Sequence, residues 1–340
     1  SEDIAYSNAG GSSIFGATLT RPMDKVLKKY PAVILITGSG QQDRDETLFE
    51  HKPFAVIADY LTKQGIVVLR VDDREKGQTT GKFMQSTTQD FANDVEAGID
   101  YLKTRKEVDV NNIGLIGHSE GGMIAPMVAS NRKDVKFIVL LAGPGVPIID
   151  LMQQQSADVA AASGLSKEDV DQYKPLYRDL LSAIIIEKDT AIAIKKATDV
   201  FIKWQTKTPE ETVKKSTGVT NEKERAEFVS GFVKQLQQPW FNYFIKINPA
   251  DYLSKVKCAV LALNGEKDIQ VAAVPNLEAI RKIMVEKEVK TFKVQALPGL
   301  NHLFQHCNKC DMPEYATIEE TFSPEALDII GNWIKGVVKK

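Results

Sequence analysis

The stretch "NNIGLIGHSEGGMIAPMVAS", residues 111–130, decides the fold. Its apolar run Ile113–Ile116 predicts a buried strand, and the apolar, alanine-containing segment after Gly122 predicts a helix. Between them Ser119 occupies the centre of a G-x-S-x-G pattern. Such a serine is either a nucleophile on a tight strand-to-helix turn or part of an ordinary glycine-rich loop. The spacing alone does not decide, so the rest of the chain must supply a base, an acid and an oxyanion site.

Similar apolar runs recur along the chain. They lack polar alternation, which is typical of strands buried on both faces of a sheet. The runs are "AVILITGSG" (32–40), "GIVVLRVDD" (65–73), "NIGLIGHS" (112–119), "FIVLLAGPG" (137–145), "CAVLALNGEKD" (258–268) and "TFKVQALPG" (291–299). A shorter β-rich segment, residues 1–30, precedes them.

Helical patterns separate the runs. They cover residues 53–64, 87–105, 276–287 and 323–338. Thr88 is expected to cap the second of these helices, and Ser323 followed by Pro324 the last. Strands alternating with helices predict an α/β fold with a mostly parallel sheet and helices on both faces. Folds of this class carry their chemistry in the loops at the carboxyl ends of the strands.

One region departs from this alternation. Residues 149–238 contain only amphipathic helical patterns joined by polar turns. We therefore expect an α/β core of residues 1–148 and 239–340 with a helical cap inserted between two strands. Because the insertion follows the carboxyl end of a strand, we favour a lid over the active edge. The alternative is a helical module packed to one side without contact to any site.

Composition limits the possible partners. The chain has 340 residues, 43% of them apolar and 26% charged, with a formal net charge of −2. This is a globular composition that gives no reason to expect nucleic acid or an anionic membrane as a partner. No apolar run reaches the roughly 20 residues of a membrane span. The first residue is Ser1 rather than Met, which suggests a removed leader and possible export; the oligomeric state is not indicated.

The candidate base and acid come from two late loops. The histidines are His51, His118, His302 and His306. His118 adjoins Ser119, so its side chain should diverge from the nucleophile, whereas His302 follows the last strand-like run. The preceding run ends in a loop that carries Glu266 and Asp268, and we favour Asp268 because Glu266 lies closer to the turn. The order Ser119, Asp268, His302 is that of α/β-hydrolase triads.

The candidate oxyanion site combines two backbone segments. One N–H should come from Glu120, the residue after the nucleophile, whose carboxylate is expected to have no part in this role. The other should come from the loop "TGSGQQDRDE" (37–46), where Gly38 and Gly40 allow close backbone approach. Ser39 is the first choice of donor, followed by Gly40 and Gln41.

The same loop carries four charged residues, Asp43, Arg44, Asp45 and Glu46. We expect a local ion-pair network that fixes the loop. The alternative is that these side chains bind a polar substrate, and a carboxylate pair among them would suit the free amine of a peptidase substrate.

Several of these segments resemble one family. "GSGQQDRDE" (38–46), "IGLIGHSEGGMIAP" (113–126), "VLALNGEKDIQV" (260–271) and "LPGLNHLFQ" (297–305) look like the bacterial EstD-type serine carboxylesterases, α/β-hydrolases close to serine aminopeptidases and acyl-CoA thioester hydrolases. The resemblance implies the α/β-hydrolase fold, a triad of Ser119, His302 and Asp268, and no cofactor or metal. It also implies a small-molecule acyl ester as substrate.

Two positions depart from the family's pattern. Glu75 stands where glycine is usual, so a positive φ there would strain the turn and could displace residues 72–82. Thr37 stands where related loops commonly have histidine, a position we interpret as structural.

The cysteines leave alternatives open. Cys258 lies in an apolar run and is expected to be a small core residue. Cys307 and Cys310 could form a disulfide, or join His302 and His306 in a zinc site. The zinc reading would use the triad base and has an unusual spacing, so we favour the disulfide if the compartment is oxidising.

We therefore predict a serine hydrolase that cleaves carboxylic esters with a short acyl part and works through an acyl-enzyme. An aminopeptidase or an acyl thioesterase with the same triad is the alternative, and a non-catalytic binding protein on the same fold is a weaker one. Six aromatic residues in and after the insertion could line an acyl pocket, although their helical spacing favours core packing: Trp204, Phe232, Trp240, Phe241, Tyr243 and Phe244.

Overall fold

The apolar runs form the predicted sheet. The computed structural model describes residues 1–23 and 28–339 and contains an eight-stranded sheet in the order β1-β2-β4-β3-β5-β6-β7-β8. The strands are β1 (Glu2–Ser7), β2 (Ile14–Thr20), β3 (Tyr30–Ile36), β4 (Val67–Val71), β5 (Val108–His118), β6 (Val135–Leu141), β7 (Ala259–Gly265) and β8 (Phe292–Leu297). This arrangement confirms the predicted α/β class with a mostly parallel sheet.

Only β2 runs against the other strands of the sheet. β1 pairs antiparallel with β2, and β2 pairs antiparallel with β4, while β3 to β8 form parallel pairs. In the centre, Leu115 of β5 lies in register with Ile34 of β3 and with Ile138 of β6. β5 therefore has neighbours on both edges and helices on both faces, which explains its continuous apolar sequence.

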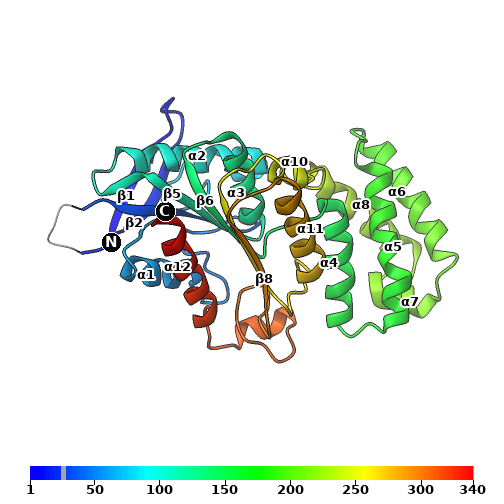
Figure 1. Ribbon diagram of the computed structural model, residues 1–340. Coiled ribbons are helices and arrows are strands. Elements are labelled where there is room, and N and C mark those ends of the chain that lie inside the picture. The colour runs from blue at the N-terminus through cyan, green and yellow to red at the C-terminus, as the bar shows by residue number, and fades with distance from the viewer. Residues whose placement is uncertain (24–27, 340) are drawn as a thin grey trace. The chain divides into compact units, whose positions relative to one another are not determined.

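Helices cover both faces of the sheet (Figure 1). They are α1 (Pro53–Lys63), α2 (Thr88–Thr104), α3 (Glu120–Asn131), α10 (Ala250–Leu253), α11 (Ala273–Glu286) and α12 (Pro324–Val338). α1 and α12 lie on one side, where Phe54 and Ile330 join a buried cluster with Val33 and Phe137 of the sheet. α2 and α3 lie on the other side (Figure 1). Two short 3₁₀ helices, Phe83–Gln85 and Met312–Ala316, lie in connecting loops.

One helix cap differs from the prediction by a single residue. Thr87, not Thr88, caps α2, because its side chain accepts from the backbone N–H of Asp90 while the Asp90 carboxylate accepts from the Thr87 N–H. Thr88 is fully buried and its hydroxyl turns inward. Ser323 caps α12 by accepting from the Ala326 N–H, and Pro324 takes the first helical position, as predicted.

The helical region forms a compact unit of its own, residues 147–248, and the α/β unit comprises residues 1–146 and 249–340. The helices of the second unit are α4 (Ile148–Ala162), α5 (Lys167–Ile184), α6 (Thr190–Gln205), α7 (Glu210–Thr217), α8 (Glu222–Leu236) and α9 (Pro239–Phe244). It extends ten residues beyond the expected end at 238, because Phe241 and Phe244 of α9 are buried and the Ile148 N–H donates to the Ile247 carbonyl at 3.0 Å.

The aromatic side chains of this unit pack against one another. Trp204 donates its indole N–H to the Gln172 carbonyl at 2.8 Å and meets Phe201 edge-on. Trp240 stacks on Phe244. These contacts are those of a helical core. Among the described residues, no helix combines the length and the apolar character needed to cross a bilayer.

Candidate active site

Ser119 lies on a sharp turn between β5 and α3. Its backbone angles are φ 53° and ψ −117°, a conformation that residues other than glycine rarely adopt. The Ser119 N–H donates to the Leu141 carbonyl at 2.8 Å, and its own carbonyl accepts from the Gly122 N–H at 2.9 Å. The fold therefore holds a strained serine at the carboxyl end of its central strand.

The glycines around Ser119 are required by packing. A Cβ on Gly117 would lie 2.0 Å from the Gly121 carbonyl oxygen, and a Cβ on Gly121 would lie 2.1 Å from the Ile36 carbonyl oxygen. Both distances are far below any real contact, so only glycine fits. Close packing of α3 beneath the turn thus explains the G-x-S-x-G spacing.

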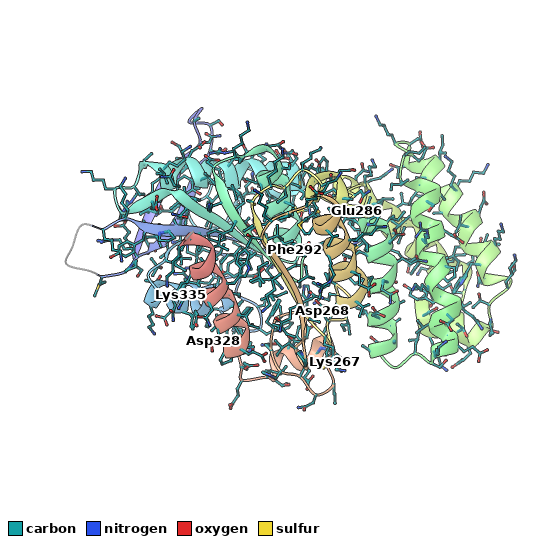
Figure 2. The ribbon with its side chains drawn as sticks, in the orientation of Figure 1. Lys267, Asp268, Glu286, Phe292, Asp328 and Lys335 are labelled. Atoms are coloured by element: carbon teal, nitrogen blue, oxygen red, sulfur yellow. A yellow bond between two sulfur atoms is a disulfide. The ribbon has the colours of Figure 1, made fainter. Side chains whose placement is uncertain are left out.

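Asp268 and His302 meet in adjacent loops of the same sheet edge. The His302 Nδ1 lies 2.8 Å from the Asp268 Oδ2, and both side chains are almost fully buried. The other Asp268 oxygen accepts from the N–H groups of Gln270 (2.8 Å) and Val271 (2.9 Å). Asp268 follows the carboxyl end of β7, whereas Phe292 pairs with Val260 near the other end of that strand; both residues are labelled in Figure 2. Glu266 is half-exposed and accepts only weakly from the Gly299 N–H at 3.4 Å, so Asp268 is the acid that reaches His302.

The third expected contact is not formed in this conformation. Within the described part of the chain, neither the Ser119 hydroxyl nor His302 Nε2 takes a hydrogen-bond partner. The structure therefore pairs the acid with the imidazole and presents the serine on its turn, and it leaves the serine hydroxyl and the imidazole unjoined. Catalytic hydrogen bonds are often long or absent before substrate binds.

The loop after β3 is tied at two points. The Gly38 N–H donates to Glu46 Oε1 at 2.7 Å, and the Gln42 N–H donates to Asp73 Oδ2 at 2.7 Å. Between these anchors the N–H groups of Ser39, Gly40 and Gln41 donate to no group in residues 1–23 or 28–339. Gly40 has φ 95°, which a side chain would disfavour. The free N–H groups are those of the three residues that the sequence proposed as oxyanion donors.

The Glu120 carboxylate has partners that the sequence analysis did not foresee. Glu120 is 2% exposed, and its Oε2 accepts from the Ser39 hydroxyl at 2.9 Å while Oε1 accepts from the Thr88 hydroxyl at 2.7 Å. The carboxylate therefore joins the loop after β3 to α2 and α3. A carboxylate inside an otherwise buried helix start was the available signal.

The four charged residues of this loop form the predicted network. Asp43 accepts from Thr47, Arg44 pairs with Asp72 and Asp3, Asp45 pairs with Arg70, and Glu46 pairs with His118. The Arg44–Asp72 ion pair is 2.6 Å long and its carboxylate is buried. All four side chains are thus engaged with this chain's own residues.

Asp73 is a partly buried carboxyl that the sequence did not single out. Desolvation raises its pKa to about 7, against hydrogen bonds from the Gln42 N–H and the Thr37 hydroxyl that favour the charged form. The charges of Glu46 and Glu120 raise the pKa further. Thr37 donates to Asp73 at 3.0 Å, which gives it the structural role that the sequence suggested. A cavity of about 50 Å³ lies beside these groups.

Glu75 has the positive φ, 63°, that the departure from glycine predicts. The loop around it is nevertheless held in place. The Glu75 N–H donates to the Thr79 carbonyl at 3.1 Å, and its carboxylate accepts from the Phe83 N–H at 2.9 Å. Arg74 binds both carboxylate oxygens of Asp94, at 2.7 and 2.9 Å. These bonds offset the strain of the turn.

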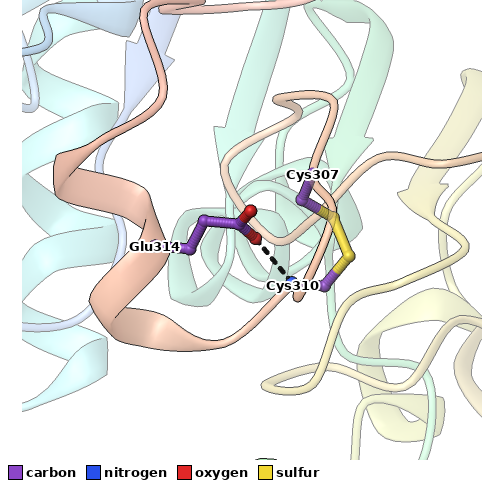
Figure 3. Close-up of side chains that lie close together, drawn as sticks. All are labelled: Cys307, Cys310 and Glu314. Carbon is purple, nitrogen blue, oxygen red and sulfur yellow. Dashed lines mark hydrogen bonds between the residues drawn. A yellow bond between two sulfur atoms is a disulfide. The ribbon is translucent and has the colours of Figure 1, made fainter.

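The proposed zinc ligands have other partners. Cys307 and Cys310 form a disulfide, with Glu314 accepting from the Cys310 N–H at 2.6 Å (Figure 3). His306 turns its Nδ1 to Glu320 at 2.9 Å, and His302 turns its own to Asp268. The four residues therefore do not converge on one point.

Cys258 is the remaining thiol. It is partly exposed rather than fully buried, because it lies just before Ala259, the first residue of β7. Desolvation raises its pKa to about 12, so it is an unreactive thiol at neutral pH.

Part of the chain matches known sequences. Residues 50–214 match a family model described as serine aminopeptidase, S33. Esterase EstD of Thermotoga maritima is 34% identical over 126 residues, which cover 37% of this chain and 30% of that protein. Human dipeptidyl peptidase 8 is 29% identical over 153 residues, which cover 43% of this chain and 17% of that protein. The chain thus spans about a third or less of the length of these curated relatives.

Solved structures match over nearly the whole chain. An esterase of Pyrococcus furiosus aligns with a TM-score of 0.55 at 17% identity, over 98% of this chain and 90% of that one. The α/β-hydrolase GrgF from Penicillium sp. sh18 aligns with a TM-score of 0.58 at 13% identity, over 100% of this chain and 99% of that one. At such identities the likeness to the solved structures concerns the fold alone. The match to Esterase EstD is higher in sequence identity but covers only part of the chain. The chain therefore has the α/β-hydrolase fold, and its matched segment is similar to that of Esterase EstD.

Proposed function

We propose that this protein is a serine hydrolase that cleaves carboxylic esters through an acyl-enzyme. The observation that carries the proposal is the buried 2.8 Å hydrogen bond between His302 and Asp268, at the sheet edge that also presents Ser119 on a strained turn. The likeness to EstD, an esterase by name, supports the ester as the substrate class.

In the acylation step Ser119 Oγ attacks the ester carbonyl carbon. His302 Nε2 accepts the hydroxyl proton and then gives it to the leaving alkoxide. Asp268 holds the proton on Nδ1, so that Nε2 presents its lone pair, and its charge stabilises the imidazolium that forms. Substrate binding must close the gap between Ser119 and His302, after which water enters by the same route to release the acid.

The developing oxyanion needs backbone N–H donors aimed at it. We assign one to Glu120, the residue after the nucleophile, and one to the segment Ser39–Gly40. Gly38 and Gln42 are unsuitable because each N–H already donates to a carboxylate. Removal of one such donor typically costs on the order of 10²-fold in kcat.

Replacement of the nucleophile tests the proposal. With p-nitrophenyl acetate, Ser119→Ala should abolish the burst of p-nitrophenol and the turnover that follows. Ser130→Ala is the matched control, because Ser130 lies in the same helix and only donates to the Met127 carbonyl. Turnover by Ser119→Ala comparable to that of the control would refute the mechanism.

A peptidase or thioesterase is the second candidate. The family model described as serine aminopeptidase favours the first of these. However, the carboxylates that could have bound a free amine, Asp43, Asp45 and Glu46, all have partners in this chain. Aminoacyl p-nitroanilides and acyl thioesters, compared by kcat/KM with p-nitrophenyl esters, separate the three activities.

The acyl length and the role of the helical unit remain predictions. We expect short acyl chains, and a series of p-nitrophenyl esters of increasing length tests this directly. We expect the helical unit to act as a lid because it begins after the carboxyl end of β6.

A further inference from the structure

His118, the residue before the nucleophile, is buried but has no part in the mechanism described above. Its ring lies beside that of His302, with 4.8 Å between the ring centroids. Its Nδ1 lies 3.0 Å from Glu46 Oε1, and its Nε2 lies 3.0 Å from the backbone carbonyl oxygen of His302. His118 therefore links the oxyanion loop to the loop that carries the base.

Both ring nitrogens of His118 face hydrogen-bond acceptors. A backbone carbonyl can only accept, so Nε2 must carry a proton. A neutral imidazole has a single N–H, and its Nδ1 would then direct a lone pair at Glu46. Both contacts are satisfied only if the ring is an imidazolium beside a carboxylate, or if Glu46 itself carries the proton.

The surroundings of Glu46 favour the first of these states. The same oxygen, Oε1, also accepts from the Gly38 N–H at 2.7 Å. Two donors on one oxygen are expected for a charged carboxylate, and such bonds stabilise the charge. Glu46 is 2% exposed, so a carboxylate there needs a cation close by.

The charged and titratable groups that face His118 come from three loops: Glu46 after β3, Asp268 after β7 and His302 after β8. Burial alone would lower the pKa of His118. The charge of Glu46, its hydrogen bond and the bond to the His302 carbonyl outweigh that effect, and the pKa is raised. The uncharged ring of Phe304 also meets the His118 ring edge-on.

We propose that His118 is a permanent imidazolium at neutral pH and that, with Glu46, it is a positioning pair for catalysis. The pair joins the oxyanion loop through Gly38, the nucleophile turn through His118 itself, and the base loop through the His302 carbonyl. The role in catalysis rests on the proposed serine-hydrolase function, but the protonation state does not.

The proposal has a consequence for alkaline pH. When His118 loses its second proton, one of its two contacts must be given up, because a lone pair then faces either Glu46 or the His302 carbonyl. The base loop and the oxyanion loop lose their common support. Activity should therefore fall on the alkaline side at the pKa of His118.

Nitrogen NMR tests the protonation state without using activity. In ¹⁵N-labelled protein, the His118 ring is assigned by comparison with His118→Gln. At pH 7, both ring nitrogens should show the shifts of protonated imidazolium nitrogens. One unprotonated, pyridine-type nitrogen on His118 at pH 7 would overturn the proposal.

Glu46→Gln tests the positioning role. The amide oxygen can still accept from Gly38 while the negative charge is removed, so His118 should become neutral at pH 7. The alkaline limb of kcat should move down by about one pH unit or more, while fluorophosphonate labelling of Ser119 persists. Glu50→Gln is the matched control, because Glu50 is exposed in the same loop.

The outcomes separate this inference from the proposed function. If Ser119 is not labelled in the unmodified protein, the hydrolase mechanism fails, and the NMR result still decides the state of His118. If labelling and turnover are normal but Glu46→Gln leaves the pH profile unchanged, the positioning role is wrong. A Glu46→Gln variant that does not fold leaves the decision to the NMR of the unmodified protein.

Discussion

Two histidine–carboxylate pairs lie side by side at the edge of this sheet. His302 and His118 each turn Nδ1 to a buried carboxylate, Asp268 at 2.8 Å and Glu46 at 3.0 Å. They differ at the other nitrogen. His118 Nε2 is bonded to a backbone carbonyl, whereas His302 Nε2 has no partner in the described part of the chain.

This difference separates a proton carrier from a structural cation. An imidazole that exchanges a proton with substrate must have one nitrogen free to do so. His118 has both nitrogens engaged, so its proton is held, and its contribution is to fix the loops that His302 and the oxyanion donors occupy. A buried pair of histidine and carboxylate is therefore not in itself a sign of catalysis.

The largest expected effect distinguishes the two pairs directly. Asp268→Asn should lower kcat by about 10⁴-fold, because the amide favours the wrong tautomer of His302. The matched change Glu46→Gln should cost less than about 10²-fold, because it leaves the hydrogen bond between His302 and Asp268 in place. Steady-state kinetics with p-nitrophenyl acetate measures both, and equal losses would remove the distinction.

Glu120 is a third buried carboxylate, and it bonds to hydroxyl groups rather than to a histidine. Glu120→Gln should lower kcat by about tenfold with little change in KM, since the oxyanion loop loses its charged anchor at Ser39 while substrate contacts remain. Glu325→Gln, an exposed acid in the first turn of α12, is the control. A rise in KM alone would show that Glu120 acts on substrate binding instead.

Asp73 shows what happens to a desolvated carboxyl that has no imidazole beside it. Its pKa is raised to about 7 in the folded protein, so the folded state holds a proton that the unfolded state has lost. The contribution to stability is therefore full below about pH 4 and lost as pH rises to about 7, with a slope of at most about 1.4 kcal/mol per pH unit.

Denaturant unfolding between pH 5 and 8 measures this slope. The part due to Asp73 should be absent in Asp73→Asn. An identical slope in both proteins would mean that Asp73 is ionised throughout this pH range.

The smallest expected effect on activity concerns the disulfide in the His302 loop. The double variant Cys307→Ser and Cys310→Ser should lose at most about 2 kcal/mol of stability, because the bond closes a very short loop. Its kcat should stay within about twofold, since His302 is held by Asp268 and through its carbonyl by His118. Thermal unfolding and kinetics test both parts, and a large loss of kcat would assign the positioning to the disulfide.

Much of this arrangement could be predicted from the sequence. Apolar runs without alternation gave the strands, and the strand ends gave the loops that hold Ser119, Asp268 and His302. Parallel strands carry their carboxyl ends to one edge, so the order of the runs was enough to bring Asp268 and His302 to the same edge.

The interactions of buried polar side chains could not be predicted in this way. Glu120, Glu46 and Asp73 lie far along the chain from Thr88, His118 and Thr37, respectively, and no periodicity links such partners. The sequence also could not decide between Thr87 and Thr88 as the cap of α2. That choice depends on the tertiary structure, in which the Thr88 hydroxyl bonds to Glu120.

The central claim is that Ser119 becomes acylated with the help of the free nitrogen of His302. Intact-mass spectrometry after brief exposure to a fluorophosphonate, with peptide mapping of the adduct, tests it most directly. The account predicts one adduct per chain, located on Ser119, and greatly slowed labelling in Asp268→Asn. An unlabelled protein, or an adduct on another residue that persists in Ser119→Ala, would contradict it.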